Sequence, residues 1–252
     1  MLYFLFQPDQ GTTPYLIALA GALVLGLAKS GLKGTGIFAV TLMALAFGAR
    51  QSTGQILPLL MFGDLFAVLY YNRHARWDHL KRFIPWMVLG IVLGAWVGKD
   101  LPEQVFKWAM AVIILGSVLL MGWWDIRKSK RVPQHPAFAG FMGLAAGVTT
   151  MIGNLAGPFS NLYFLAMRLP KNEFIGTAAW LFLLTNWFKL PLHIFVWKTI
   201  DAEVLRTDLW LLPGVLVGLF AGVRLVRLIR DTSYRRIILF LTALGAILIM
   251  VQ

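Results

Sequence analysis

Long apolar runs separated by short charged segments dominate the chain. Residues 83–97, 108–124, 209–223 and 237–251 contain no charged side chain. A helix needs about 20 apolar residues to cross a hydrocarbon core about 30 Å thick, and these runs approach that length. The pattern therefore predicts membrane-spanning helices, near 55–71, 81–98 and 103–124 in the first half of the chain and near 173–196, 210–226 and 234–251 in the second half. The helix that follows Arg50 is predicted to be capped by Gln51, Ser52, Thr53 and Gln55.

A longer apolar segment precedes each group of three helices, at 14–47 and 136–167. Each is interrupted near its centre by residues that disfavour a continuous helix, KSGLKGTG at 29–36 and TTMIGNLAGP at 149–158. We expect each segment to form a hairpin of two short helices. Legs of about 15 residues would reach roughly 22 Å, enough to bring each tip to the middle of the bilayer. The sequence leaves open whether the hairpins are re-entrant or fully spanning.

Composition and charge support a membrane protein and exclude a nucleic-acid partner. The chain is 59% hydrophobic and 13% charged, whereas soluble domains carry about 25% charged residues. Its net charge of +12 is concentrated in three segments, 73–82, 125–131 and 224–236, which carry +3, +3 and +4. Basic loops mark the cytoplasmic side of a membrane protein. We therefore expect a multi-pass protein of the cell (inner) membrane with these loops inside and both termini outside.

The charge map gives the two halves opposite orientations, and glycine spacing suggests that they are copies. Gly90, Gly94 and Gly98 recur as Gly214, Gly218 and Gly222. Glycine at every fourth position lets another helix approach closely, so packing alone is the alternative explanation. The predicted fold is an all-α integral membrane inverted repeat, each half a broken-helix hairpin followed by three transmembrane helices. Residues 1–127 form the first repeat, 128–135 a basic cytoplasmic linker, and 136–252 the second, inverted repeat.

Several of these segments resemble the TauE/SafE sulfite exporter family, also called the toluene sulfonate uptake permease family. The resemblance rests on GLAKSGLKGTG at 26–36 and LPLLMFGD at 57–64, and in the second half on residues 143–158, RLPKNEF at 168–174 and NWFKLP at 186–191. It implies a duplicated permease that carries sulfite, sulfonates or related small organic anions and uses no cofactor. Lys33 and Asn154 depart from the usual glycine run of the family, which leaves the particular substrate open.

The charged residues predicted inside the membrane are Lys29, Lys33 and Lys189 against Asp64, a net +2. Charges in the bilayer are costly and need partners or a wet cavity, so a positive interior favours an anion. Helix N-termini and glycines at the tips would add backbone donors and close approach. The predicted substrate-binding residues are Lys29, Ser30, Lys33, Gly34, Thr35, Gly36, Gly153, Asn154, Gly157, Pro158 and Asn161. The candidates for coupling or ion pairing are Asp64, Asn186 and Lys189.

The roles of the four charged residues remain open at this level. Lys29 and Lys33 either contact substrate, or one pairs with Asp64 while the other snorkels to the interface. Asp64 is either a counter-ion or a carboxylate that takes up a proton during transport. Lys189 either snorkels or faces the cavity. The predicted partners are thus a small anion, the lipid bilayer and, as an alternative, a coupled proton.

These features predict a secondary transporter for a small anion. An anion channel of the same fold is the main alternative, and an intramembrane enzyme is less favoured. The chain has no His-Glu-x-x-His or Gly-x-Ser-x-Gly motif and no cysteine. We therefore expect no catalytic residues, no metal site and no cofactor.

Because the chain lacks cysteine, single cysteines can report its orientation. In sealed cells an impermeant thiol reagent should modify Gln252→Cys but not Lys128→Cys, since the basic loops are expected inside. Labelling of Lys128→Cys from the outside would contradict the predicted topology.

Overall fold

The computed structural model describes residues 13–126 and 136–229, and every element in these ranges is helical. The first half contains α1 (Thr13–Lys29), α2 (Gly36–Phe47), α3 (Ala49–Tyr71), a 3₁₀ turn (Asn72–His74), α4 (Trp77–Gly98) and α5 (Glu103–Ile126). The second half contains α6 (Pro136–Gly153), α7 (Gly157–Ala166), α8 (Lys171–Pro191), a π-helical turn (Leu192–Val196) and α9 (Ala202–Leu228). The expected helix at 234–251, the linker at 128–135 and both chain termini lie outside the described residues.

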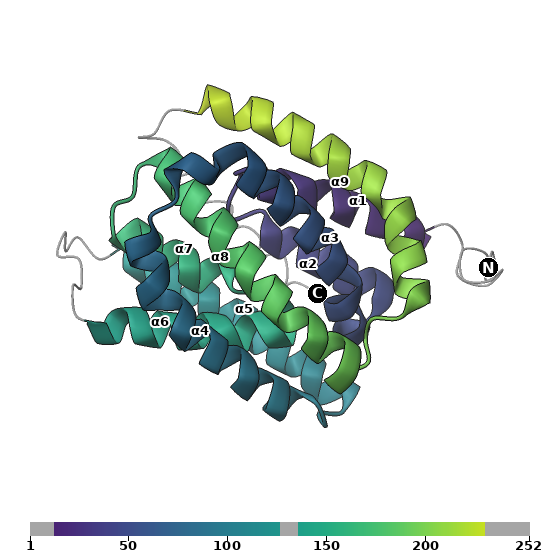
Figure 1. Cartoon of the computed structure of the whole chain (residues 1–252). Helices are drawn as coiled ribbons and strands as arrows, with labels where there is room; N and C mark the ends of the chain where they lie inside the picture. Colours follow the sequence, from purple (N-terminus) through teal and green to yellow (C-terminus); the bar gives the residue numbers. More distant parts are fainter. Residues whose placement is uncertain (1–12, 127–135, 230–252) are drawn as a thin grey trace.

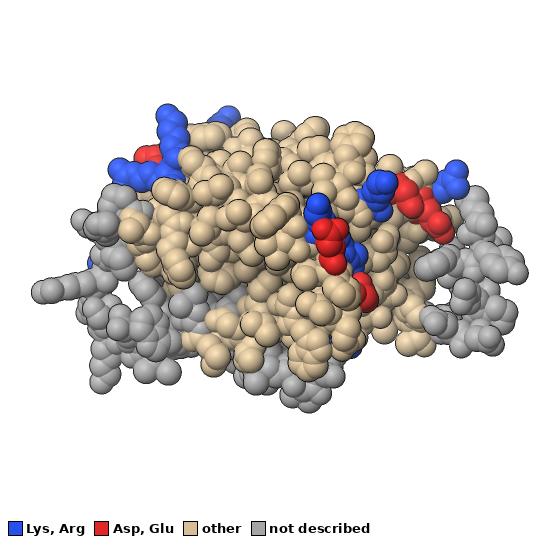
Figure 2. Space-filling view, turned by 90° about the horizontal axis from the view of Figure 1, so that it is seen from below, with Lys and Arg blue, Asp and Glu red and all other residues tan. Residues whose placement is uncertain are grey.

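Four of the described helices are long and apolar enough to cross a membrane: α3, α4, α8 with its π-helical extension, and α9. Large apolar side chains on them are exposed, among them Leu69, Trp96, Leu209 and Phe220. On the face shown in Figure 2, charged side chains gather toward the two ends and leave a region of uncharged side chains between them. This distribution matches a protein whose middle faces lipid, and the chain is a multi-pass membrane protein.

Both long apolar segments are broken into hairpins. α1 and α2 pack side by side across a break at 30–35, and α6 and α7 do so across a break at 154–156. Gly34 has φ +101° and Asn154 has φ +55°. Glycine and asparagine are the residues that most readily adopt such left-handed conformations. The predicted interruptions are therefore the places where the chain turns back.

Helices of one half pack against helices of the other half. α1 lies beside α9 and α6 lies beside α4, while α3 and α8 pack together between these pairs (Figure 1). Glycines make the closest contacts: a Cβ on Gly218 would lie 3.0 Å from Gly26 Cα, and a Cβ on Gly147 would lie 2.8 Å from Gly90 Cα. Backbone therefore meets backbone at both contacts. The first helix of each half, α1 or α6, packs against the fourth helix of the other half, α9 or α4.

The expected cap of α3 is wrong. α3 begins at Ala49, so Ser52 and Thr53 lie inside the helix, where their hydroxyls donate to the carbonyls of Ala49 and Arg50 at 2.8 and 2.7 Å. The side chain of Gln55 is buried and reaches α9. Hydroxyls that bond back to the preceding turn are compatible with a helix interior, which the sequence pattern did not separate from a cap.

α9 also begins earlier than predicted, at Ala202 rather than near 210. Asp201 caps it, because its Oδ1 accepts hydrogen bonds from the backbone N–H groups of Glu203 and Val204, both at 2.9 Å. Aspartate is a strong N-cap residue, so Asp201 was the signal for this start. In consequence Asp208, which precedes the helix predicted near 210–226, lies inside α9 and is buried.

The glycine contacts predict that alanine substitutions will destabilise the protein at some glycines and not at others. Gly90→Ala and Gly218→Ala should each destabilise the protein by about 1 to 3 kcal/mol, because the new methyl group meets backbone atoms that cannot give way. Gly116→Ala is the control, since a Cβ there meets no atom of the described residues within 4 Å. Thermal unfolding in detergent measures the difference. Equal melting temperatures for all three variants would show that these contacts do not limit packing.

Candidate functional site

A cavity of about 80 Å³ lies between the two hairpin tips and the central helices. Residues far apart in the sequence line it together, since both tips contribute. Its polar and tip residues are Lys29, Lys33, Gly34 and Gly36 from the first hairpin, Asn154, Gly157, Pro158 and Asn161 from the second, Thr150 from α6, and Asn186 from α8. Apolar side chains, including Ile56 and Leu60 of α3 and Phe182 of α8, complete the wall.

Lys29 forms a buried ion pair with Asp64. Its Nζ lies 2.5 Å from Asp64 Oδ1, and Asn186 Nδ2 donates to Asp64 Oδ2 at 2.7 Å. Asp64 has no exposed surface. Gly63 makes room for the lysine, because a Cβ there would lie 2.7 Å from Lys29 Cγ. Each oxygen of the carboxylate therefore has a donor, and the pair carries no net charge.

Lys33 is buried without a carboxylate. It is 4% exposed, so it does not snorkel to an interface. Within the described part of the chain, no acidic group lies within ion-pair distance of its ammonium. The ammonium faces the ring of Phe182, 5.4 Å from its centroid, and Lys29 Nζ lies 4.9 Å from the same ring. A ring face attracts a cation but supplies no negative charge, so the ammonium form of Lys33 has no counter-ion within ion-pair distance among the described residues.

Lys189 holds the second tip in place. Its fully buried Nζ donates to Thr150 O at 3.1 Å, to Thr150 Oγ1 at 3.2 Å and to Asn154 Oδ1 at 2.5 Å. Asn154 Nδ2 in turn donates to the carbonyl of Thr53 on α3 at 3.0 Å. Lys189 thus neither snorkels nor lines the cavity, and its hydrogen bonds fix the left-handed turn at Asn154.

Asn161 brings an unused amide group to the cavity. It is 2% exposed, and its Oδ1 has no hydrogen-bond partner among the described residues. Gly157 lies one helical turn before it on α7, and a Cβ at Gly157 would meet only Asn161 Nδ2, at 3.9 Å. An amide offers either its oxygen or its NH₂ group after a flip, so this end of the cavity can donate hydrogen bonds to a ligand.

Three of the predicted binding residues do not line the cavity. The hydroxyls of Ser30 and Thr35 donate to the carbonyls of Leu27 and Leu32, both at 2.8 Å, and Gly153 packs against Leu155. These three residues belong to the two tips but lie outside the cavity wall, where their contacts stabilise the turns. The sequence reasoning also missed Phe182, although its position one helical turn before Asn186 puts both on one face of α8.

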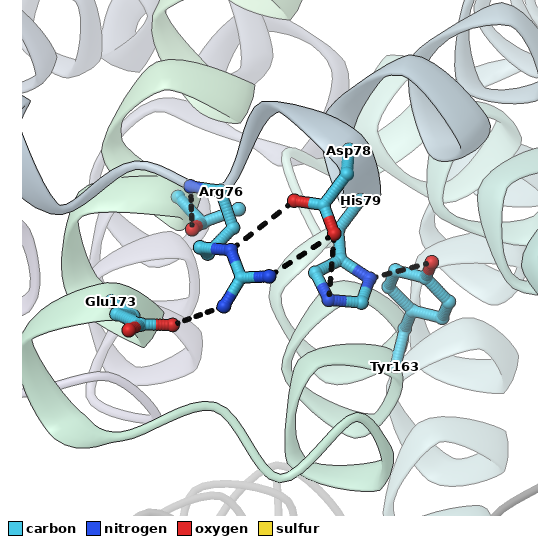
Figure 3. A network of polar contacts seen from close by, with 6 residues as sticks. Arg76, Asp78, His79, Tyr163 and Glu173 are labelled. Carbon is cyan, nitrogen blue, oxygen red and sulfur yellow. Dashed lines mark hydrogen bonds and ion pairs between the residues drawn. The ribbon is translucent and has the colours of Figure 1, made fainter.

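A second polar network joins the starts of α4 and α8 to the last part of α7 (Figure 3). Arg76 donates to Glu173 Oε2 at 3.0 Å and to Asp78 Oδ1 at 3.3 Å, and Tyr163 OH lies 3.5 Å from His79 Nδ1. Hydrogen bonds to Glu173 and then to Asp78 raise the pKa of Arg76. Because Arg76 is exposed, these pairs contribute little to stability, and their role is to hold the turn before α4 against α8.

The chemistry of the cavity suits an anion rather than a metal ion. The described residues contain no group of three His, Cys, Asp or Glu side chains that could hold a metal. A buried ammonium and glycine-lined helix starts favour negative charge, and the Asn161 amide can donate to an anion when its NH₂ group faces the cavity.

The family model described as "Sulfite exporter TauE/SafE" matches residues 17–249. No curated protein and no solved structure shows a significant match. The matched range contains both hairpins, the cavity and all four described spanning helices. The chain therefore belongs to the sulfite exporter TauE/SafE family, a family of membrane transporters and not of enzymes.

Proposed function

We propose that the protein is a secondary transporter that binds one small sulfur-containing oxyanion or sulfonate between its two hairpin tips. The observation that carries this proposal is the ammonium of Lys33, buried in the cavity with no carboxylate within ion-pair distance among the described residues. Sulfite is the simplest anion of this class, and the family description names it.

The balance of buried charge supports an anionic ligand. A charged side chain in the bilayer costs at least about 2.5 to 3.5 kcal/mol without compensation. Lys29 is compensated by Asp64, and Lys189 by three oxygen atoms. Among the described residues, Lys33 has the Phe182 ring and the cavity but no oxygen partner. A bound anion would supply the missing negative charge.

Size and hydrogen bonding narrow the ligand class. A cavity of about 80 Å³ is far smaller than the roughly 300 to 1,000 Å³ of sites for drug-sized ligands. Gly36 and Gly157 begin α2 and α7 at the cavity wall, where helix N-termini favour negative charge. Asn161 adds an amide beside them. A compact anion with several oxygens can use all of these donors at once.

The packing also supports two inverted repeats, with residues 1–127 and 136–252 as the units. The contacts of α1 with α9 and of α6 with α4 correspond to each other when the halves are exchanged, and a glycine pair lies at each contact. Inverted repeats with broken helices at the midplane suit a carrier that exposes one site to each side in turn.

Replacing Lys33 should weaken anion binding without lowering the stability of the fold. Lys33→Gln should weaken sulfite binding roughly ten- to a hundredfold, because a hydrogen bond to a charged group is worth about 1.5 to 3 kcal/mol. Its melting temperature should not fall, since no carboxylate loses its partner. Calorimetric titration of the purified variant with sulfite, sulfate and taurine, with uptake into proteoliposomes, measures the effect.

Gly157→Leu is the steric companion of that variant, because Gly157 lines the cavity and a Cβ there is 3.9 Å from Asn161 Nδ2, so the larger side chain would occupy the space of the anion. It should abolish sulfite binding and leave the protein folded. Unchanged affinity in both Lys33→Gln and Gly157→Leu, with both proteins folded, would place the anion site elsewhere.

Asp64 should behave as a counter-ion. Asp64→Asn leaves the Lys29 ammonium buried and unpaired, so it should destabilise the protein by about 3 to 5 kcal/mol. Adding Lys29→Gln should restore much of the loss, and thermal unfolding of the two single variants and the double variant gives the coupling. Additive losses would show that the pair contributes no mutual stabilisation.

A further inference from the structure

Asp208 is a buried carboxyl group that the anion site does not use. It lies in the second turn of α9, is 6% exposed and faces α3. Gln55 Nε2 donates to Asp208 Oδ1 at 2.8 Å and to the carbonyl of Val204 at 3.2 Å. Asp208 Oδ2 has no hydrogen-bond partner among the described residues. One amide hydrogen bond is thus the whole polar support of this carboxyl group in the described structure.

The helices packed against α9 bring no cation to Asp208. The charged residues of α3 are Arg50, whose guanidinium binds the carbonyls of Gly98, Lys99 and Leu101, and Asp64, which is paired with Lys29. α1 contributes only that same Lys29 as a charged group and Tyr15 as a further titratable group. Each described cation of these two helices therefore already has other partners.

The nearest titratable groups along the chain also leave Asp208 alone. Lys198, Asp201, Glu203 and Arg206 are all exposed. His193, on the π-helical turn, bonds through Nδ1 to Thr199 Oγ1 at 2.8 Å, and its Nε2 has no hydrogen-bond partner among the described residues, Asp208 included. An isolated carboxylate in such a site would lack most of the compensation that buried charges require, whereas the neutral acid would not.

Asp64 shows what a charged carboxylate needs in the same protein. Both of its oxygens have a donor, and one donor is an ammonium. Asp208 has one neutral donor for two oxygens. We propose that Asp208 is a proton-binding site, neutral in this conformation, and that it is the proton-exchanging group of the transporter. The binding of the proton stands by itself, while its coupling to transport rests on the proposed function.

α3 gives Asp208 a direct structural link to the anion cavity. Gln55, which holds Asp208, follows Thr53, whose carbonyl binds Asn154 of the second tip, and precedes Ile56 in the cavity wall. Pro58 lies inside the same helix, and proline removes one backbone hydrogen bond and favours a bend there. A change at Gln55 therefore acts on the same turn of α3 whose Thr53 carbonyl accepts the hydrogen bond from Asn154 of the second tip.

Release of the proton breaks one bond, the O–H bond of the Asp208 carboxyl group, and uptake forms it again. When α9 and α3 separate enough to admit water, the O–H bond of the Asp208 carboxyl breaks, the proton passes to water and the carboxylate remains. Reprotonation from water on the other side restores the neutral acid and lets it return to its site beside Gln55. No oxidant, cofactor or second substrate takes part.

Infrared spectroscopy of the purified protein tests the bound proton directly. The wild type at neutral pH should show the C=O stretch of a protonated, buried carboxylic acid, which shifts in deuterated water. Asp208→Asn should lose this band, and Asp208→Glu should retain one, because it keeps a carboxyl group. The double variant Asp64→Asn with Lys29→Gln removes the other buried carboxylate together with its ammonium, so it is the matched control and should leave the band intact. Absence of the band in the wild type, or its survival in Asp208→Asn, would overturn the assignment.

Transport by proteoliposomes tests the coupling. An imposed pH gradient should drive sulfite accumulation at least tenfold in the wild type, and Asp208→Asn should abolish this gradient-driven accumulation while its equilibrium sulfite affinity stays within about twofold. Gradient-driven accumulation that persists in a folded Asp208→Asn would refute coupling through Asp208. Failure of the wild type to bind sulfite would instead refute the proposed function, and the infrared band would still decide whether Asp208 holds a proton.

Discussion

The cost of burying lysine ammonium groups in a lipid-facing protein governs this structure. Three lysines lie inside, and each has a different environment. Lys29 has a carboxylate, Lys189 has oxygen atoms of the second tip, and Lys33 has an aromatic ring and an open cavity. Because uncompensated charge is expensive in the bilayer, the third environment favours a ligand of opposite charge. The protein therefore needs polar groups around a cavity at its centre and an apolar outer surface toward the lipid.

Close packing of backbone against backbone makes this interior possible. Gly26 against Gly218 and Gly90 against Gly147 draw the first helix of each half onto a helix of the other half. With the outer helices fixed in this way, both hairpin tips project toward the centre, where α3 and α8 cross between them (Figure 1). The central helices then supply the groups that hold the tips: Asp64 on α3 binds Lys29, and Lys189 on α8 binds Asn154. Small residues thus determine where the charged residues can meet.

The sequence predicted the breaks, the apolar spans and the cluster of lysines, because these depend on local composition. It could not decide which lysine pairs with Asp64. Lys29 and Lys33 are four residues apart, and the structure resolves the choice through Gly63, which leaves space for the stem of Lys29 alone. Ser30 and Thr35 were expected at the ligand, yet their hydroxyls are used by carbonyls three residues earlier. Such local hydrogen bonds compete with ligand contacts and depend on the conformation of the turn, which residue types do not specify.

Asp208 and Lys33 extend the same electrostatic reasoning to the transport cycle. Each is a buried ionisable group for which the described residues provide no group of opposite charge. In the proposed cycle a bound anion would compensate the ammonium and a bound proton would neutralise the carboxyl group, so the protein with both ligands would have the lowest cost of buried charge. Since Gln55 and the contact of Thr53 with the second tip lie on one turn of α3, loss of either ligand changes the forces on the same helix. When the anion or the proton has left, the protein carries an unbalanced buried charge, so a conformational change that exposes the charged group to water costs least in these states. These are also the states in which a carrier must bind its ligands again.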